Sequence, residues 1–372
     1  MRLMPLHMVK PGMKLGKRIS DEDGITLLGE QTELTQNLIN RLRSRGVDYV
    51  YIDDPRTRDL VIRDTLSDET RSRALTEIRH AFRGVMDDQI KRKFASSSRL
   101  GQTFRGVMDL LLDDLLANRD AMIMLTNISV MDQYLYQHSL NVCVYTTMLG
   151  MSHGYSREQL MTLGLGAPLH DVGKTQIPPE SLRKKEPLTD SEYEVIKKHA
   201  EYGYRLLKDE PNIPLLSAHC ALQHHERLDG SGYPRGLKGD EIHEFARWIG
   251  LADSYDAMTT HRAYRSAMLP HQAMEILFTG TGTLYEKRMI EMFRDRIAIY
   301  PLGLTVKLNT GETGVVVGIN EMVPQRPVVR IIQDAYGQEV CSPTDVDLSE
   351  KLSLMITGVS GGTERNDPVI AS

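Results

Sequence analysis

Apolar residues recur at intervals of three and four over most of residues 67–300, and this spacing predicts helices that each bury one face. Polar loops are expected to interrupt these helices at 175–188 and 227–243. The two stretches before residue 120 carry one apolar stripe each. Such helices pack either on their own domain or on a second copy of the chain, so a homodimer is left open. The first stripe comprises Ala74, Ile78, Ala81, Phe82 and Val85, and the second comprises Phe104, Val107, Met108, Leu111, Leu112 and Leu115.

The first 53 residues follow a different pattern, in which short apolar runs alternate with turn signals and predict a small α/β unit. Thr35 is expected to cap a helix that Gly46 ends. The run Val47–Ile52 is rich in β-forming residues and predicts a strand. Residues 54–66 are polar and are expected to form a linker.

Beyond Pro301 the pattern changes to β-branched runs separated by turn sequences. Leu304–Leu308, Val315–Ile319 and Val328–Ile332 predict three strands of a small β-module. The polar residues from 360 onward predict a disordered tail. The expected organisation is an α/β N-terminal domain at 1–66, linker helices at 67–120, a mainly helical domain at 121–300, the β-module at 301–359 and the tail at 360–372.

The composition of the chain limits the kinds of molecule that it is expected to bind. Of the 372 residues, 41% are hydrophobic and 26% are charged, as in ordinary soluble globular proteins. The net charge of −5 gives no general basic field for nucleic acid or a membrane surface, so an anionic ligand needs local cations. The sequence shows neither an apolar stretch long enough for a membrane span nor a signal-like segment, which predicts a cytoplasmic protein. The three cysteines, Cys143, Cys220 and Cys341, form no paired motif and are expected to be buried thiols.

Histidines and acids dominate the candidate chemistry. A His-Asp pair at 170–171 is followed by Lys174, and a His-His pair at 224–225 precedes the glycine-rich segment 228–234. His199 lies between the two pairs. Helical bundles supply metal ligands in this manner, with one or two from each helix. Imidazole together with carboxylate suits first-row divalent ions, so the pattern predicts a metal site.

These motifs, together with Gly232-Tyr233-Pro234, resemble those of the HD-GYP family, the phosphodiesterase branch of the HD-domain superfamily. The resemblance extends over residues 125–300 and implies a mainly α fold with an HD-type helical bundle. The segment before residue 54 also resembles the small domain that precedes some HD-GYP domains.

The resemblance implies two divalent transition metal ions, of Fe, Mn, Ni or Zn, that share one carboxylate. Asp171 would bind both ions, each through one oxygen, and Glu226 is one residue expected to orient an imidazole. The first ion would take His138, His170, Asp171 and Asp253, and the second would take Asp171, His199, His224 and His225.

A third metal is expected to be absent. Some family members carry a glutamate one helical turn before the first ligand histidine, and that glutamate helps to hold a third ion. Here Tyr134 occupies the position, and a phenol is a poor ligand unless it is ionised.

Cationic side chains near the motifs are expected to bind phosphate. Lys174 would contact a phosphate oxygen and stabilise the leaving oxygen. Arg262 and Arg265 lie three apart, on one face if helical, and arginine suits both phosphate and guanine. By resemblance, these two arginines with Asp256 and Tyr233 would contact cyclic di-GMP. The loop at 228–234 would cover the ligand and could contact GGDEF-domain cyclases.

The leading hypothesis is a metal-dependent phosphodiesterase that hydrolyses cyclic di-GMP to pGpG, with continuation to GMP left open. A hydroxide shared by the two ions would attack the phosphate. One alternative is a module that binds cyclic di-GMP without useful turnover and signals through its terminal domains. Another is an HD phosphohydrolase for a different nucleotide, which the Gly-Tyr-Pro loop disfavours.

Overall fold

The computed structural model describes residues 1–20, 26–45, 47, 49–62, 65–90, 100–117, 134–182, 184, 186–260 and 267–359. These residues form two compact units. The terminal unit contains Met1–Ile19, Leu27–Ile62 and the chain from Tyr300 onward, and the helical unit contains Ser20–Thr26 and Arg63–Ile299.

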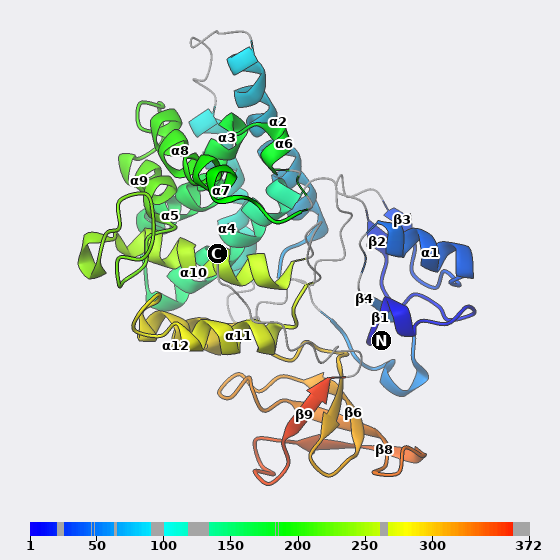
Figure 1. Cartoon of the computed structure of the whole chain (residues 1–372). Helices are drawn as coiled ribbons and strands as arrows, with labels where there is room; N and C mark the ends of the chain where they lie inside the picture. The colour runs from blue at the N-terminus through cyan, green and yellow to red at the C-terminus, as the bar shows by residue number, and fades with distance from the viewer. Residues whose placement is uncertain are drawn as a thin grey trace. The chain divides into compact units, whose positions relative to one another are not determined.

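The helical unit is organised around α4 (Tyr134–His153) and α10 (Glu244–Thr259), which pack against each other (Figure 1). Residues 138–150 of α4 are all buried, so this helix has no solvent face over that stretch and forms the centre of the bundle. The other helices are α5 (Arg157–Leu169), η5 (Val172–Gln176), α6 (Pro179–Leu182), α7 (Asp190–Lys197), α8 (His199–Leu207), α9 (Leu215–Gln223), η6 (Gly239–Glu241), α11 (Pro270–Thr279) and α12 (Lys287–Arg296).

The two expected helices before residue 120 are present as α2 (Asp68–Ile90) and α3 (Leu100–Ala117). Their apolar stripes pack within the helical unit, with α2 against α3 and α4 and with α3 against α5. The ring of Phe82 lies 5.8 Å from the ring of Tyr136 and 6.5 Å from that of Phe104. Packing on their own unit therefore accounts for these stripes, and a homodimer stays a prediction.

The N-terminal part of the terminal unit is the expected small α/β fold. Strand β1 (Arg2–Pro5) pairs antiparallel with β4 (Tyr49–Ile52), and β2 (Ile19–Ser20) pairs with β3 (Thr26–Leu28). Thr35 caps α1 (Gln36–Ser44) as predicted, since its side chain accepts a hydrogen bond from the Leu38 amide at 3.3 Å. Gly46 lies outside the described residues.

The prediction of a polar linker at 54–66 is wrong for its described first half. Pro55–Thr57 forms the short helix η2, and Asp54, Thr57 and Leu60 are buried. These buried residues pack within the terminal unit, to which Leu27–Ile62 belongs.

The C-terminal β-module is an antiparallel five-stranded sheet in the order β8-β7-β6-β5-β9. The three predicted strands are present, and the sequence did not indicate the two edge strands. Cys341 lies exposed on β8, so its predicted burial is wrong, whereas Cys143 and Cys220 are buried. The strands are β5 (Thr305–Leu308), β6 (Thr313–Gly318), β7 (Val328–Gln333), β8 (Glu339–Asp347) and β9 (Ile356–Val359).

The N-terminal segment and the β-module are joined within the terminal unit. The Leu3 amide donates a hydrogen bond to the Gly303 carbonyl at 2.8 Å, next to β5. Arg330 on β7 binds Asp59 through two hydrogen bonds of 2.6 and 2.8 Å and binds Asp345 through two of 2.7 and 2.9 Å. Its Nη1 also donates to the Arg56 carbonyl at 2.9 Å. One guanidinium thus connects the β-module to the segment after β4.

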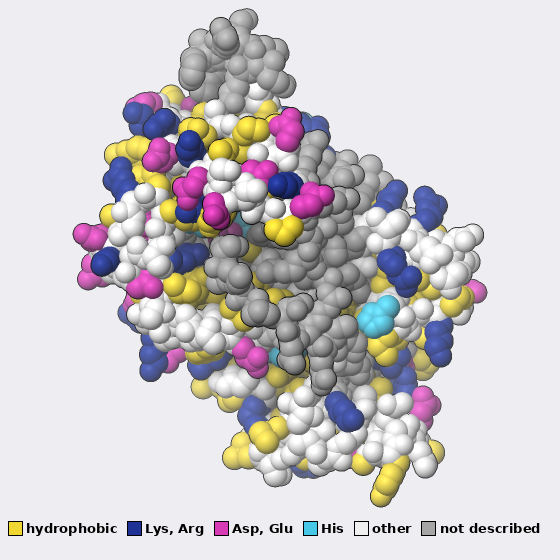
Figure 2. All heavy atoms as spheres, viewed as in Figure 1, with side chains coloured by type: hydrophobic (Ala, Val, Ile, Leu, Met, Phe, Trp, Pro, Cys, Tyr) yellow, Lys and Arg dark blue, Asp and Glu magenta, His cyan; other side chains and the backbone are white. Residues whose placement is uncertain are grey.

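Charged side chains of both signs are interspersed over the described part of the face in Figure 2, in keeping with the small net charge of −5. An anionic ligand must therefore be bound by cations gathered at its own site. Within the described chain, every helix is too short or too polar to cross a membrane.

Arg330→Ala is expected to lower the free energy of unfolding of the terminal unit by about 1–2 kcal/mol, because it removes charge-assisted hydrogen bonds to two carboxylates. Urea denaturation of the full chain measures this, with Arg43→Ala, an exposed arginine on α1, as the control for charge. The difference between the variants should shrink at high salt. Equal stability of the two variants at low salt would show that Arg330 does not stabilise the unit.

Candidate metal centre

The structure brings all seven predicted metal ligands together in the helical unit. They come from separate elements whose ends and faces converge. His138 lies in α4 and Asp253 in α10, while the two adjacent pairs follow the last residues of α5 and α9. His225 is partly exposed and the other six are buried: His138, His170, Asp171, His199, His224 and Asp253.

Asp171 lies between two groups of imidazoles. Its Oδ2 is 3.3 Å from His170 Nε2 and 3.7 Å from His138 Nε2. Its Oδ1 is 3.4 Å from His199 Nε2 and 3.8 Å from His224 Nε2. Each carboxylate oxygen therefore faces a different pair of rings, which is the geometry that a carboxylate shared by two cations requires.

The ligand atoms fall into overlapping groups. Asp171, His199, His224 and His225 have ligand atoms that all lie within 4.8 Å of one another, as do those of His138, His170 and Asp171. Asp253 lies close to the group that contains His138 and His170. Its Oδ1 is 3.1 Å from His138 Nε2 and 3.9 Å from His170 Nε2. A further group, His170, His224 and Asp253, combines members of both predicted ligand sets, so the division of the ligands between two ions stays a prediction.

Hydrogen bonds at the outer nitrogens orient the rings. The Nδ1 atoms of His170, His199 and His224 each bond to the carbonyl three residues earlier, at 2.6, 2.8 and 2.9 Å. These carbonyls lie in the last turns of helices, and those of Ala167 and Ile196 also accept hydrogen bonds from the backbone amides of His170 and Lys198. Nδ1 must then carry the proton, which leaves the lone pair of Nε2 facing the cluster.

The side chain of Asp256 points into the protein interior. It is fully buried, its Oδ2 is 2.7 Å from His138 Nδ1, and its Oδ1 accepts a hydrogen bond from Asn141 at 2.8 Å. Both oxygens have partners inside the protein, so this arrangement does not support the predicted contact with cyclic di-GMP, which stays a prediction. Asp256 instead orients His138 as the helix-end carbonyls orient the other rings. The sequence signal was its position three residues after Asp253, on the same side of α10.

Lys174 reaches the cluster through the short helix η5. Its Nζ lies 2.5 Å from Asp171 Oδ2, and its side chain is 22% exposed, so the ammonium connects the cluster to solvent. The preceding Gly173 allows this arrangement, because a Cβ there would overlap the His199 carbonyl at the start of α8.

Tyr233 of the glycine-rich loop also lies at the cluster. Its ring stacks on His225, with centroids 4.6 Å apart and planes at 24°. Tyr193 and Lys197 of α7 flank the same ring, with Lys197 Nζ 5.6 Å from its centroid. Sequence reasoning did not single out these two residues, because a tyrosine and a lysine on a short helix are common at any surface.

Glu226 has a different role from the one expected. Its carboxylate accepts hydrogen bonds from the amides of Arg235 and Leu237, at 2.8 and 3.0 Å. It therefore fixes the loop that carries Tyr233 rather than an imidazole.

Three predicted positions cannot be placed. Arg262 and Arg265 lie outside the described residues. Tyr134 begins α4, but its side chain lies outside the described part of the chain. Their predicted roles in ligand binding and in excluding a third metal stay predictions.

Protonation in the cluster suits a metal. Burial lowers the pKa of His199 to about 4 and holds the pKa values of His224 and His225 well below the usual range, so these rings are neutral at pH 7. Burial opposes ionisation of Asp171, but Lys174 and neighbouring imidazoles hold the pKa of its carboxyl well below its usual value. In the described chain, the buried His170 Nε2 and Asp171 Oδ1 have no hydrogen-bond partner. Neutral imidazoles, an ionised carboxylate and inward-facing unbonded atoms fit a divalent cation.

Comparison with known proteins agrees with this chemistry. Residues 112–289 match the family model of the HD domain. A cyclic di-GMP phosphodiesterase of Pseudomonas aeruginosa is 29% identical over 343 residues, which make up 87% of this chain and 81% of that protein. These similarities support an HD-GYP domain protein. The predicted resemblance is thereby confirmed.

Other relatives match over shorter stretches of the chain. A cyclic di-GMP phosphodiesterase response regulator of Xanthomonas campestris is 40% identical over 37% of each chain. A 3′3′-cGAMP-specific phosphodiesterase of Vibrio cholerae is 30% identical over 52% of this chain and 37% of that protein. Residues 305–367 match the family model of a KOW domain associated with HD domain, so the β-module is KOW-like.

Metal binding at pH 7 is expected to release about one proton from His138. Burial lowers the pKa of His138, but hydrogen bonds to Asp253 and Asp256 raise it more, to about 9. The ring is therefore protonated at pH 7 in the metal-free protein and must lose that proton to bind a cation through Nε2. The apparent affinity should rise about tenfold per pH unit up to the pKa of His138 and level off above it.

Calorimetric titration in buffers of different ionisation enthalpy counts the protons released. In Asp256→Asn the pKa of His138 should fall and fewer protons should be released. An unchanged proton count in that variant would contradict the assignment to His138.

Proposed function

We propose that this chain is a metal-dependent phosphodiesterase that hydrolyses cyclic di-GMP to pGpG. The observation that carries the proposal is the placement of Asp171, whose two oxygens face two separate pairs of imidazoles. A cluster built in this way suits two divalent cations of Fe, Mn, Ni or Zn. The names of the relatives from Pseudomonas and Xanthomonas supply the substrate.

The proposed ligands divide between the two ions at Asp171. Its Oδ2 side has His138, His170 and Asp253, and its Oδ1 side has His199, His224 and His225. When bound, two such cations supply a nucleophile from water at neutral pH and neutralise charge on the phosphate.

The chain's own residues complete the site around the phosphate. Lys174 offers an ammonium beside Asp171 at the solvent edge, where it can bind a phosphate oxygen. Tyr233, held against His225, covers one side of the cluster. Arg262 and Arg265 are proposed to bind the second phosphate or a guanine. A contact between the glycine-rich loop and GGDEF domains stays a prediction.

A second candidate substrate is 3′3′-cGAMP, because a relative from Vibrio cholerae is named as specific for it. Incubation of the metal-loaded protein with each cyclic dinucleotide, followed by chromatography of the products, separates the possibilities. Hydrolysis of cyclic di-GMP to pGpG supports the proposal, and faster hydrolysis of 3′3′-cGAMP would reassign the substrate. Tight binding of cyclic di-GMP without product would favour the sensor alternative.

Asp171→Ala is expected to abolish turnover and to remove most of the bound metal while the helical content stays unchanged, because both ions depend on this carboxylate. Elemental analysis and circular dichroism of the purified variant measure the two effects. Asp209→Ala, at a carboxylate that is 84% exposed, serves as the control. Retention of two metals per chain in Asp171→Ala would refute the bridging role.

Lys174→Ala is expected to lower kcat by about 10²-fold or more and to leave the metal content unchanged, since the ammonium acts on the phosphate. Steady-state kinetics with metal analysis on the same sample tests this. Lys184→Ala is the matched control, because Lys184 pairs with Glu192 at 2.7 Å in the neighbouring segment. Equal kcat values in the two lysine variants would show that Lys174 is an ordinary surface charge that does not act on the phosphate.

A further inference from the structure

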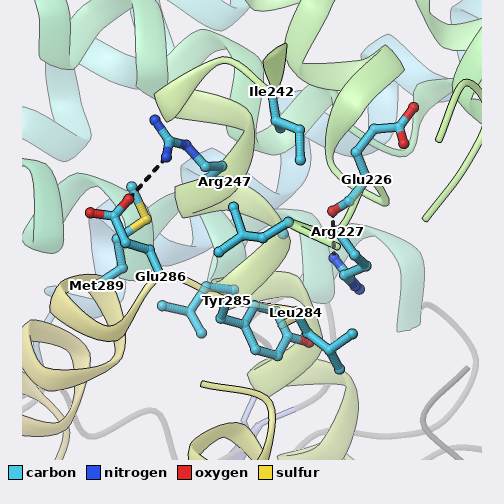
Figure 3. Close-up of a pocket in the computed structure, with 11 residues that line it drawn as sticks. Glu226, Arg227, Ile242, Arg247, Leu284, Tyr285, Glu286 and Met289 are labelled. Carbon is cyan, nitrogen blue, oxygen red and sulfur yellow. Dashed lines mark hydrogen bonds and ion pairs between the residues drawn. The ribbon is translucent and has the colours of Figure 1, made fainter. Parts of the chain in front are cut away.

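A hollow lies beside the metal centre, between α10, the segment after His225 and the turn before α12 (Figure 3). It is a small hollow that opens to solvent. Two arginines line it and have different partners. Arg247 pairs with Glu286 at 3.0 Å and faces Asp240 at 3.7 Å, so its contacts are with surface carboxylates.

Arg227 instead binds the backbone that carries two proposed metal ligands. Its Nη1 donates to the carbonyls of His224 and Glu226, both at 3.3 Å. Its Nη2 donates to the Ser254 hydroxyl at 3.3 Å, and its guanidinium lies 5.2 Å from the ring centroid of Tyr285. Figure 3 shows the side chains of Arg227 and Tyr285 close together in the hollow.

Ser254 links the same network to α10. Its hydroxyl donates to the Gly250 carbonyl and accepts from the Tyr285 hydroxyl, both at 2.7 Å. Ser254 directly follows Asp253, the proposed ligand on this helix. A Cβ at Gly250 would overlap the His224 carbonyl, so α10 and the end of α9 touch backbone to backbone here.

We propose that Arg227 is a positioning residue that acts through Ser254 and Tyr285 to fix the His224–His225 pair relative to Asp253, and that it thereby sets the affinity for metal. This inference rests on the proposed metal site. Arg227 does not touch the ligand atoms. It binds the carbonyls on both sides of His225 and the hydroxyl next to Asp253.

The direction of the His224 ring depends on this backbone. Its Nδ1 bonds to the Ala221 carbonyl, so a tilt of the chain at 224–226 moves the ring as well. His225 follows immediately and has no helix of its own to hold it. The guanidinium can bond two carbonyls and a hydroxyl at once because its donors are fixed in one plane, which the ammonium of lysine cannot reproduce.

Arg227→Lys tests the proposal, with Arg247→Lys as a control from the same hollow. The full-length protein is stripped of metal and titrated with Co²⁺, and both the Kd and the visible absorption spectrum are recorded. Arg227→Lys is expected to weaken Co²⁺ binding about tenfold or more and to change the spectrum, because the ligand geometry is altered. Arg247→Lys should keep the wild-type Kd and spectrum.

Ser254→Ala provides a second route if Arg227→Lys folds poorly, since it keeps the arginine and removes only the shared hydroxyl. It should shift the Kd and the spectrum in the same direction. Tyr285→Phe keeps the ring beside the guanidinium and should have a smaller effect.

The outcomes separate this inference from the proposed function. If the unmodified protein binds no Co²⁺, both are overturned. If it binds Co²⁺, and Arg227→Lys and Ser254→Ala keep its Kd and spectrum, only the positioning role is overturned. An equal loss of affinity in Arg227→Lys and Arg247→Lys would also overturn it, because the cause would then be general loosening of the fold.

Discussion

Ring orientation in the metal centre depends on carbonyl groups in the last turns of helices. Regular hydrogen bonding to the amide four residues ahead ends there, so these carbonyls can accept from a side chain, alone or together with a nearer amide. At three places a histidine just beyond such a turn donates Nδ1–H to the carbonyl three residues back, and its other nitrogen is thereby fixed toward the cluster. Carbonyl groups at helix ends thus fix the orientation of these three rings. His138 lies inside α4, where the carbonyls are already bonded, and it needs the carboxylate of Asp256 for the same purpose.

This arrangement explains why so many polar groups can be buried at the centre of one bundle. Buried carboxylates are costly unless charges or hydrogen bonds compensate them. Asp171 has an ammonium at one oxygen, while Asp256 has an imidazole and an amide. Oδ1 of Asp171 has no hydrogen bond in the described chain. The centre is therefore built for a cation, and metal binding should stabilise the fold by mass action.

Local sequence signals gave the helices and the ligand positions. The stripe around Phe82 and the cap at Thr35 follow from spacing and residue type alone, and the ligand set follows from motifs in a fixed order. The roles of Asp256 and Glu226 could not be obtained in that way, since a carboxylate near a metal motif can face the substrate, a ring or a backbone amide. The contacts of Arg227 depend on a turn near residue 285 that is distant in sequence. Strand β8 was missed because most of its side chains are exposed and polar, so it lacks the apolar alternation of a half-buried strand.

The hydrogen bond between Leu3 and Gly303 has a consequence for the order of events during synthesis. A ribosome delivers β1 and its partner β4 long before β5, so the contact between β1 and the β-module must wait until the helical unit has been made. Apart from Ser20–Thr26, the helical unit lies in the single stretch Arg63–Ile299, and it can form early. Closing a loop of this length costs little more entropy than closing one half as long. The risk of aggregation therefore comes from the delay and not from the entropy of loop closure. Until the β-module has been synthesised, the β1–β4 pair exposes an unpaired sheet edge. A chain cut after Ile299 should therefore retain a folded bundle and carry an N-terminal segment prone to aggregation.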